Sequence, residues 1–354
     1  MKICILGDTH FGMRNDSQLF FDYAEEFYIN SLFPYLKENN ITTILQLGDF
    51  WDRRKYINFN TLKRTKEIFL DFLLKENIEL ITLLGNHDVF YKNSNDVNSS
   101  DLLLSEYKNI KVINTPQTLS IGGEEFCIIP WICADNYNDC LKEITNTTAN
   151  FCAGHFEING FMMYRGGHLC HEGLDSTIFR KFAYTFSGHY HHKSSKNDIH
   201  YVGSPMEMTW MDYNDPRGFH IFDIDNRELS FHKNPYVMHH RLIYNDAEND
   251  YSNVGVDYLK GKYVKVVVVN KTSPYTFDRY LDKIYSIEPA DVSIVEDFTD
   301  LMEGVDEEMV NQAEDTLTIL NRTVDTLSEN GIDNGKLKNI LRELYIEASN
   351  IGVV

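Results

Sequence analysis

Five short polar motifs, each built on a glycine, carry residue types from which a metal-dependent active site could form. In chain order they are Gly7-Asp8-Thr9-His10, Gly48-Asp49-Phe50-Trp51-Asp52, Gly85-Asn86-His87-Asp88, Gly154-His155 and Gly188-His189-Tyr190-His191. One such motif alone would be weak evidence, because a single Gly-Asp or Gly-His pair arises often by chance. Five in succession favour one shared site over a set of unrelated core residues.

Carboxylate, imidazole and amide side chains together suit the hydrolysis of a phosphoester. The negative charge of a phosphoester repels hydroxide, so an enzyme needs concentrated positive charge and a nucleophile near neutral pH. Two divalent ions about 3.5–4 Å apart supply both, because they lower the pKa of a shared water and hold the phosphoryl oxygens. Mixed nitrogen and oxygen ligands favour Mn, Fe or Zn over an all-oxygen Mg site. We expect two divalent ions, with Mn2+ preferred and Mg2+, Fe and Zn as alternatives.

Each motif follows an apolar run that predicts a β-strand. The runs are Ile3–Leu6, Thr43–Leu47, Leu80–Leu84, Phe151–Ala153 and Tyr184–Phe186. Segments with helical spacing lie between them, including 20–37 and 61–75. Strands that alternate with helices predict an α/β domain, in which residues placed after strand ends can meet at one edge of the core. The glycine at each junction allows the backbone to turn sharply and to approach a ligand.

Composition sets wider limits on the protein. No apolar stretch approaches the length of about 18 residues that a membrane span needs, and the N-terminal apolar run is too short for a signal peptide. We therefore expect a soluble, cytoplasmic protein without a membrane partner. Six scattered cysteines without a CxxC pair predict reduced thiols. The formal net charge is −20, but eleven Asp and Glu lie between residues 288 and 315, where Lys and Arg are absent, so the remaining chain is only mildly acidic.

The last third of the chain predicts additional units. A polar stretch over 242–257 precedes an apolar strand at Tyr263–Val269. We predict a first domain over 1–235, a small α/β unit over 236–290 and an acidic linker over 291–308. Helical spacing then predicts a helix through Met309, Ala313, Leu317, Leu320, Val324 and Leu327, a stop at Asn330-Gly331, and a second helix through Leu337, Ile340, Leu341, Leu344 and Ala348. This helical pair, 309–354, packs either on its own body or on a partner's helices.

The five motifs together resemble those of the calcineurin-like metallophosphoesterases. The shared pattern is Asp-x-His, Gly-Asp-x-x-Asp, Gly-Asn-His-Asp, Gly-His and Gly-His-x-His, and it covers about residues 1–225. The resemblance implies an α/β sandwich of two sheets flanked by helices. It also implies one metal ion held by Asp8, His10, Asp49 and His191, and a second held by Asp49, Asn86, His155 and His189, so that Asp49 is the bridge.

The same resemblance implies roles for two other histidines. His87 would stay off the metals and act as the catalytic residue, either as general acid or as a stabiliser of developing charge. His192 follows the last motif directly but does not belong to it. We interpret His192 as a bystander.

A narrower similarity points to nucleases. The runs Asp8-Thr9-His10-Phe11-Gly12, Ile129-Pro130-Trp131 and Tyr201-Val202-Gly203-Ser204-Pro205 resemble the SbcD-type nuclease subunit of SbcCD recombination complexes. The runs 151–161 and 214–219 are similar to the recombination endonuclease subunit of T-even-type phages. This resemblance implies a DNA-processing homodimer, with 236–290 as a cap domain and the helical pair bound to the coiled coil of an SMC-like ATPase. It further implies a phage-encoded protein in the bacterial cytoplasm, with helices near 56–75 and 94–107 at the dimer contact.

Three functions remain open at this point. The leading one is a manganese-dependent DNA exo/endonuclease subunit of an SMC-like ATPase–nuclease complex, for DNA end processing, recombination and repair. The metal motifs alone do not distinguish it from a phosphoesterase acting on small molecules or phosphoproteins. A non-catalytic alternative is a subunit that mainly bridges DNA ends, which the intact ligand set disfavours. Arg53 and Arg54 could contact phosphate or the dimer mate, and the Met-rich and aromatic-rich residues 206–213 could pack or stack on nucleic acid.

Overall fold

The computed structural model describes residues 1–167, 169–296 and 341. All five predicted strands form in it, and each strand ends within two residues of the glycine of its motif. The strands are β1 (Lys2–Leu6), β2 (Thr43–Gln46), β3 (Glu79–Leu83), β9 (Phe151–Gly154) and β10 (Tyr184–Ser187). They belong to two different sheets. In one sheet β1, β2 and β3 are parallel neighbours, and in the other β9 and β10 are parallel neighbours.

Each of these two sheets has six strands. The first has the order β14-β13-β1-β2-β3-β6 and the second β11-β12-β10-β9-β8-β7. In the first, β6 (Ile110–Ile113) extends the parallel part, and β13 (Gly218–Asp223) and β14 (Glu228–Lys233) form an antiparallel pair beside β1. In the second, β8 (Glu124–Ile129) and β12 (Ile199–Tyr201) are parallel to β9 and β10, while β7 (Gln117–Ile121) and β11 (Ser194–Lys196) are antiparallel edge strands.

Alternate residues of β1 face different layers. Ile3 and Ile5 are buried in the cluster between the two sheets, together with Phe186 of the second sheet. Cys4 and Leu6 point the other way and pack in the cluster that includes the early helices. A strand with both faces buried shows this period of two. The two-sheet sandwich flanked by helices that the family resemblance implies is therefore confirmed.

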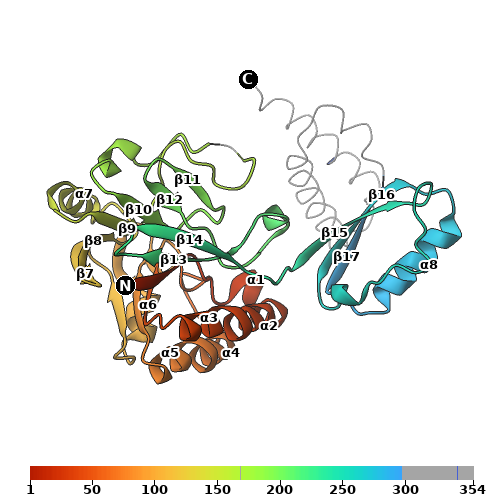
Figure 1. Ribbon diagram of the computed structural model, residues 1–354, viewed down its shortest axis with the longest axis horizontal. Coiled ribbons are helices and arrows are strands. Elements are labelled where there is room, and N and C mark those ends of the chain that lie inside the picture. The colour runs from red at the N-terminus through yellow and green to blue at the C-terminus, as the bar shows by residue number, and fades with distance from the viewer. Residues whose placement is uncertain (168, 297–340, 342–354) are drawn as a thin grey trace, which may run out of the picture. The chain divides into compact units, whose positions relative to one another are not determined.

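Helices cover the outer faces of both sheets (Figure 1). On the first sheet, α2 (Gln18–Phe27) runs through a π-helical turn (Tyr28–Leu32) into α3 (Phe33–Glu38), and α4 (Phe59–Thr65) runs through another (Lys66–Leu70) into α5 (Asp71–Lys75). The shorter α1 (Met13–Asp16) and α6 (Ser99–Leu104), the helix α7 (Tyr137–Asn146) on the second sheet, and three 3-10 turns (Ser176–Phe179, Trp210–Asp212, Asp257–Leu259) complete the helices before residue 260. Every helix in the described ranges is too short or too polar to cross a membrane.

The chain divides into two units by its internal contacts. Unit 1 comprises Met1–His240, Leu259–Tyr263 and Glu288–Asp291, and the described part of unit 2 comprises Arg241–Tyr258, Val264–Ile287 and the residues that follow Asp291. A three-stranded sheet of β15 (His239–Asn245), β16 (Tyr263–Asn270) and β17 (Asp291–Glu296) accompanies α8 (Pro274–Tyr285). The hydroxyl of Ser273 accepts the Thr276 N–H and caps the start of α8.

Three sequence predictions are corrected by these boundaries. Unit 1 reaches His240 rather than residue 235. The predicted acidic linker 291–308 begins instead with β17, because β-branched Val292, Ile294 and Val295 between the acidic residues favour a strand beside β16. The helix predicted near 94–107 is reduced to α6, since β5 (Ser94–Asn98) pairs with β4 (Val89–Tyr91).

The C-terminal predictions are almost entirely untouched by the structure. The rest of the linker and the helical pair 309–354 lie outside the described residues, apart from Leu341. The cysteine prediction can be assessed, because all six cysteines are described. Each is buried with a free thiol, as the sequence predicts.

Candidate metal centre

The strand ends of the two sheets bring all eight predicted site residues into one cluster. The first sheet supplies Asp8 and His10 after β1, Asp49 after β2, and Asn86 and His87 after β3, while the second supplies His155 after β9, and His189 and His191 after β10. These positions are the carboxyl ends of parallel strands, which is where α/β sheets commonly bind ligands. The contacts described next join the eight residues to one another.

Asp49 lies between imidazoles that come from both sheets. Its Oδ2 atom is 3.7 Å from Nε2 of His10 and 3.4 Å from Nε2 of His155. All three residues are at most 3 % exposed. A carboxylate flanked by two ring nitrogens is a candidate ligand for a metal ion on either side of it.

Further nitrogen and oxygen atoms gather at each of these imidazoles. Nε2 of His10 is 3.1 Å from Nε2 of His191. Oδ1 of Asn86 is 3.0 Å from Nε2 of His155 and 3.0 Å from Nδ1 of His189. Imidazole nitrogens and an amide oxygen that converge in this way form a donor set suited to a transition-metal ion.

Asp8 and the local backbone complete the cluster. Both carboxylate oxygens of Asp8 accept the backbone N–H of His189, each at 3.1 Å, and Oδ1 is 3.5 Å from Nδ1 of His155. His10, Asp49 and His189 have φ angles of 43°, 52° and 83°. Residues other than glycine rarely adopt this left-handed region, and such strain is concentrated at functional sites.

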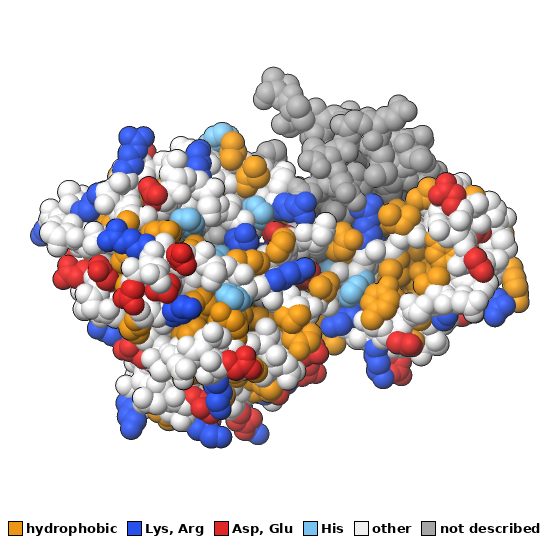
Figure 2. Space-filling view, viewed as in Figure 1, with side chains coloured by type: hydrophobic (Ala, Val, Ile, Leu, Met, Phe, Trp, Pro, Cys, Tyr) orange, Lys and Arg blue, Asp and Glu red, His pale blue; other side chains and the backbone are white. Residues whose placement is uncertain are grey.

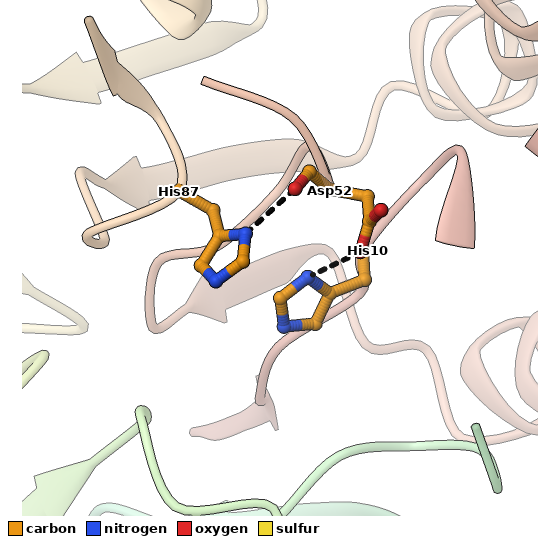
Figure 3. Close-up of side chains that lie close together, drawn as sticks. All are labelled: His10, Asp52 and His87. Carbon is orange, nitrogen blue, oxygen red and sulfur yellow. Dashed lines mark hydrogen bonds and ion pairs between the residues drawn. The ribbon is translucent and has the colours of Figure 1, made fainter. Parts of the chain in front are cut away.

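Contacts at Nδ1 indicate how the two central imidazoles face. Nδ1–H of His155 donates to the Leu47 carbonyl at 2.7 Å, and Nδ1 of His10 is 3.2 Å from a carboxylate oxygen of Asp52 (Figure 3). Metal-binding histidines usually donate their second N–H to a carbonyl or carboxylate in this way. In both residues Nε2 is therefore the nitrogen turned toward Asp49.

His87 lies at the margin of the cluster and contacts it through its backbone and ring. Its backbone N–H donates to Oδ1 of Asp49 at 2.7 Å, and Nδ1–H donates to the Asp52 carbonyl at 2.6 Å (Figure 3). The His87 ring meets the His10 ring edge-on, with 4.9 Å between centroids. Since a carbonyl only accepts, Nδ1 carries the proton and Nε2 is the atom left for substrate.

The carboxylates of the cluster set the charge of its buried imidazoles. Burial lowers the pKa of His10, but the Asp52 hydrogen bond and the charges of Asp49 and Asp8 together raise it to about 9. Burial also opposes the charged form of His155, and there too Asp49 and Asp8 raise the pKa to about 9. The metal-free site therefore holds protons at neutral pH that metal ions would replace.

The pKa values of the other two imidazoles, those of His189 and His191, are lowered. Burial and the charge of His155 lower the pKa of His189 to about 3. Burial, His10 and Arg217 hold the pKa of His191 well below its usual range. Both rings are thus neutral at pH 7, which is the form in which imidazole binds metal ions.

Two buried side chains that the sequence analysis left without a role hold the motif loops together. Asp88 accepts backbone N–H groups of Gly85 at 2.8 Å, Trp51 at 3.1 Å and Phe50 at 3.3 Å. Burial and the nearby charge of Asp49 raise the pKa of Asp88 to about 7. Asp88 and Asp52 both belong to the quoted motifs, so their positions were visible in the sequence, but their contacts depend on the fold.

Gln46, the last residue of β2, is the second of these side chains. Its amide nitrogen donates to the carbonyls of Gly48 at 2.6 Å and Gly7 at 3.3 Å. Its amide oxygen accepts the Thr82 hydroxyl at 2.6 Å. The close approach of the loops also explains Gly85, where a Cβ atom would lie 2.2 Å from the backbone nitrogen of Asp49.

His192 contacts a network of charged side chains that includes Asp215 and Arg217. Its Nδ1 atom is 3.0 Å from Asp215, which also pairs with the buried guanidinium of Arg217 at 2.9 Å. Arg217 further donates to the carbonyl oxygen of His191. The network therefore supports the loop that carries His191.

Comparisons with known proteins agree with this geometry. Residues 1–193 match the family model of the calcineurin-like phosphoesterases. The chain is 32 % identical to exonuclease subunit 1 of Enterobacteria phage T4, over 99 % of this chain and all of that one. It is 24 % identical to the SbcD subunit of the SbcCD nuclease of Staphylococcus epidermidis, over 65 % of this chain and 67 % of that one.

Among solved structures, GAP50 of the inner membrane complex of Plasmodium is similar with a TM-score of 0.41 and 14 % identity, over 66 % of this chain and 85 % of that one. The family match covers more than half of the chain, and the phage relative aligns with nearly all of it. Members of this family bind divalent metal ions, and the clustered side chains described above are candidate ligands. The chain belongs to the calcineurin-like phosphoesterase family.

Proposed function

We propose that this protein is a two-metal DNA exo/endonuclease subunit that processes DNA ends in recombination and repair. The observation that carries the proposal is the position of Asp49, whose Oδ2 atom lies 3.7 Å and 3.4 Å from two oriented ring nitrogens. The substrate class is supported by the names of two relatives, an exonuclease subunit and a nuclease subunit. Histidines reach the surface among Lys and Arg side chains on the face of unit 1 shown in Figure 2, which suits a polyanionic substrate.

Two ions fit the donor set that the cluster presents. Asp8, His10, Asp49 and His191 would hold the first, and Asp49, Asn86, His155 and His189 the second. The Nδ1 contacts of His10 with Asp52 and of His155 with the Leu47 carbonyl support this assignment, because Nε2 of each ring then lies toward the shared carboxylate. When bound, the ions supply Lewis acidity and lower the pKa of water. We favour Mn2+, because the ligands mix imidazole with oxygen donors.

His87 is the proposed catalytic residue. The Asp52 carbonyl accepts Nδ1–H at 2.6 Å, so Nε2 carries a proton only when the ring is cationic. In that form His87 donates the Nε2 proton to the leaving ribose oxygen, or stabilises charge developing on the phosphoryl group. The bond to Asp52 and the bond from the His87 backbone N–H to Asp49 hold the ring beside the cluster without making it a ligand.

The proposed partners are DNA, an SMC-like coiled-coil ATPase and a second copy of this chain, in the cytoplasm of a bacterial host. Both relatives are named as subunits. The ATPase would bind the predicted helices 309–354, with residues 236–290 acting as a cap domain.

Deletion of the chain from Asp306 onward should abolish ATPase binding and preserve basal metal-dependent cleavage. Equal loss of both would contradict the domain assignment.

An apolar surface in unit 1 supports the homodimer. Tyr56, Phe59 and Leu102 are 60 %, 84 % and 70 % exposed, on and beside α4 and α6. A pocket of about 170 Å3 lined by Tyr56, Leu102 and basic residues 53–55 lies in the same surface. Large exposed apolar side chains gathered in one place mark interaction sites.

The nuclease proposal is tested by Mn2+-dependent release of nucleotides from linear duplex DNA, with p-nitrophenyl phosphate as the monoester control. The wild-type chain should cleave DNA and turn over little monoester, and Asp49→Ala and His87→Ala should each abolish cleavage. Efficient monoester turnover without DNA cleavage, even after the ATPase partner is added, would favour a phosphatase instead.

A further inference from the structure

A second pocket, of about 430 Å3, adjoins the metal centre on the side of the second sheet. His155, a proposed metal ligand, is one of its lining residues, whereas His87 and His10 are not. Its volume lies within the range of about 300–1,000 Å3 that small-molecule sites occupy. A phosphodiester held at the metal centre would therefore place one of its two nucleosides beside this pocket.

Trp131 forms the wall that the pocket shares with the metal centre. Its ring centroid is 5.4 Å from that of His189 and 5.9 Å from that of His155. The backbone is fixed, because its N–H donates to the Leu84 carbonyl at 2.7 Å and its carbonyl accepts the Asn136 amide at 2.9 Å. The indole is thus a pre-positioned flat surface next to the proposed ligands.

The other walls are mainly apolar, with one exposed aromatic ring. Ile178 and Leu174 line the pocket, and Tyr137, the first residue of α7, contributes a ring that is 46 % exposed. Gly173 closes one side at a point where a Cβ atom would lie 2.5 Å from the Glu157 carbonyl. Aromatic and aliphatic walls of this kind bind the flat face of a nucleobase, whatever its sequence.

The charges in the pocket argue against the phosphate backbone as its occupant. The carboxylate side chains that line it are Glu157 and Asp175, and the lining drawn from the described residues includes neither Lys nor Arg. Two carboxylates would repel a phosphate, but they accept hydrogen bonds from the amino groups of bases. The basic residues 53–55 line the other pocket.

We infer that this pocket binds the nucleobase of the nucleotide adjacent to the scissile phosphate. The inference rests on the proposed nuclease function and deepens it, because it makes a base, and not only a phosphodiester, part of what the site recognises. Tyr137 and Trp131 supply the stacking surfaces, and the Glu157 carboxylate, which also lines the pocket, supplies a hydrogen-bond acceptor.

The test uses the full-length protein and single-stranded oligonucleotides with one abasic residue placed on either side of a defined phosphodiester. In the wild type, removal of the base on one side should slow cleavage of that bond about tenfold, the size expected for one base–aromatic stack. Tyr137→Ala should cleave intact and abasic strands at nearly equal rates, and Tyr137→Phe should restore the difference. Tyr285→Ala, at a tyrosine of similar exposure (51 %) that does not line the pocket, should behave as the wild type.

Hydrolysis of bis(p-nitrophenyl) phosphate, a diester without a nucleobase, distinguishes failure of the base pocket from failure of the nuclease proposal. Tyr285→Ala, at a residue that lines neither the pocket nor the metal centre, should hydrolyse this diester at the wild-type rate. DNA cleavage that is equally fast with and without the flanking base, or a base dependence unchanged in Tyr137→Ala, overturns the base pocket and leaves the nuclease standing. Turnover of the diester without any DNA cleavage overturns the nuclease, and the base pocket with it.

Discussion

The carboxylate of Asp49 contacts three histidines, and the charges around it make metal binding sensitive to pH. The pKa values of His10 and His155 are raised to about 9 in the metal-free protein, so both rings are mostly protonated at pH 7. A metal ion has to displace those protons. As the pH rises toward about 9, the His10 and His155 rings lose their protons before a metal ion binds. As the pH falls, protons compete more strongly with the metal ion for the two rings.

We therefore predict that the affinity for Mn2+ increases between pH 6 and pH 9, and that binding at pH 7 releases protons. Titration calorimetry in two buffers with different heats of ionisation measures that release directly. Binding heats that are the same in both buffers would contradict the charge states assigned to His10 and His155.

Substitutions of His87, the proposed catalytic residue, and of His192, a nearby histidine without a proposed role, can be compared directly. His87→Gln should lower kcat for DNA cleavage about 10²–10⁴-fold, the range for loss of a general acid, while Mn2+ binding stays unchanged because His87 is not a proposed ligand. His192→Gln should retain most activity, since that ring pairs with Asp215 outside the cluster. A large loss of Mn2+ affinity in His87→Gln would show instead that His87 is a ligand.

At the scale of elements, the loop after β10 is held by a buried arginine. Arg217 is 4 % exposed and pairs with Asp212 at 2.7 Å and Asp215 at 2.9 Å, in addition to its contact with the His191 carbonyl. Removing one partner of a buried ion pair leaves uncompensated charge and typically lowers stability by about 3–5 kcal/mol.

Arg217→Met should therefore lower the free energy of unfolding by that amount and also weaken Mn2+ binding, because His191 loses its support. Urea denaturation and calorimetry measure the two effects. The control is Arg64→Met, which removes a surface pair with Asp22 and Glu25 and should change stability by less than about 1 kcal/mol. Equal stability of the two variants would refute the proposed role of Arg217.

Element positions were the part of the structure most accessible from the sequence. Apolar runs followed by glycine predicted β1, β2, β3, β9 and β10, because runs that are this short and bounded by glycine favour buried strands over helices. The division of these strands between two sheets was not predictable, since it depends on pairing between distant segments. The acidic composition around β17 likewise obscured its β-branched residues.

The candidate site shows the same division between residue identity and residue contacts. The eight predicted residues were identifiable from the motifs, and the structure brings them together. The supporting contacts were not identifiable from the sequence, because they involve the main chain. The backbone carbonyl of Asp52 accepts a hydrogen bond from His87, and Arg217 donates to the backbone carbonyl of His191. Contacts that involve the main chain leave no pattern of residue types.

At the scale of the whole molecule, the apolar surface around α4 and α6 predicts self-association. Phe59→Asp would place a charge at a side chain that is 84 % exposed in the single chain. If a second copy covers this surface, the variant should sediment as a monomer at concentrations where the wild type is a dimer. Tyr275→Asp, at a 72 % exposed residue of α8, should leave the dimer intact. A wild type that is monomeric throughout would exclude the proposed dimer.

The central claim, a pair of metal ions bridged by Asp49, is tested most directly by anomalous X-ray scattering at the manganese edge from crystals of the full chain grown with Mn2+. We predict two peaks about 3.5–4 Å apart, on either side of the Asp49 carboxylate, one among Asp8, His10 and His191 and the other among Asn86, His155 and His189. A single peak, or peaks that Asp49 does not contact, would contradict the two-metal site.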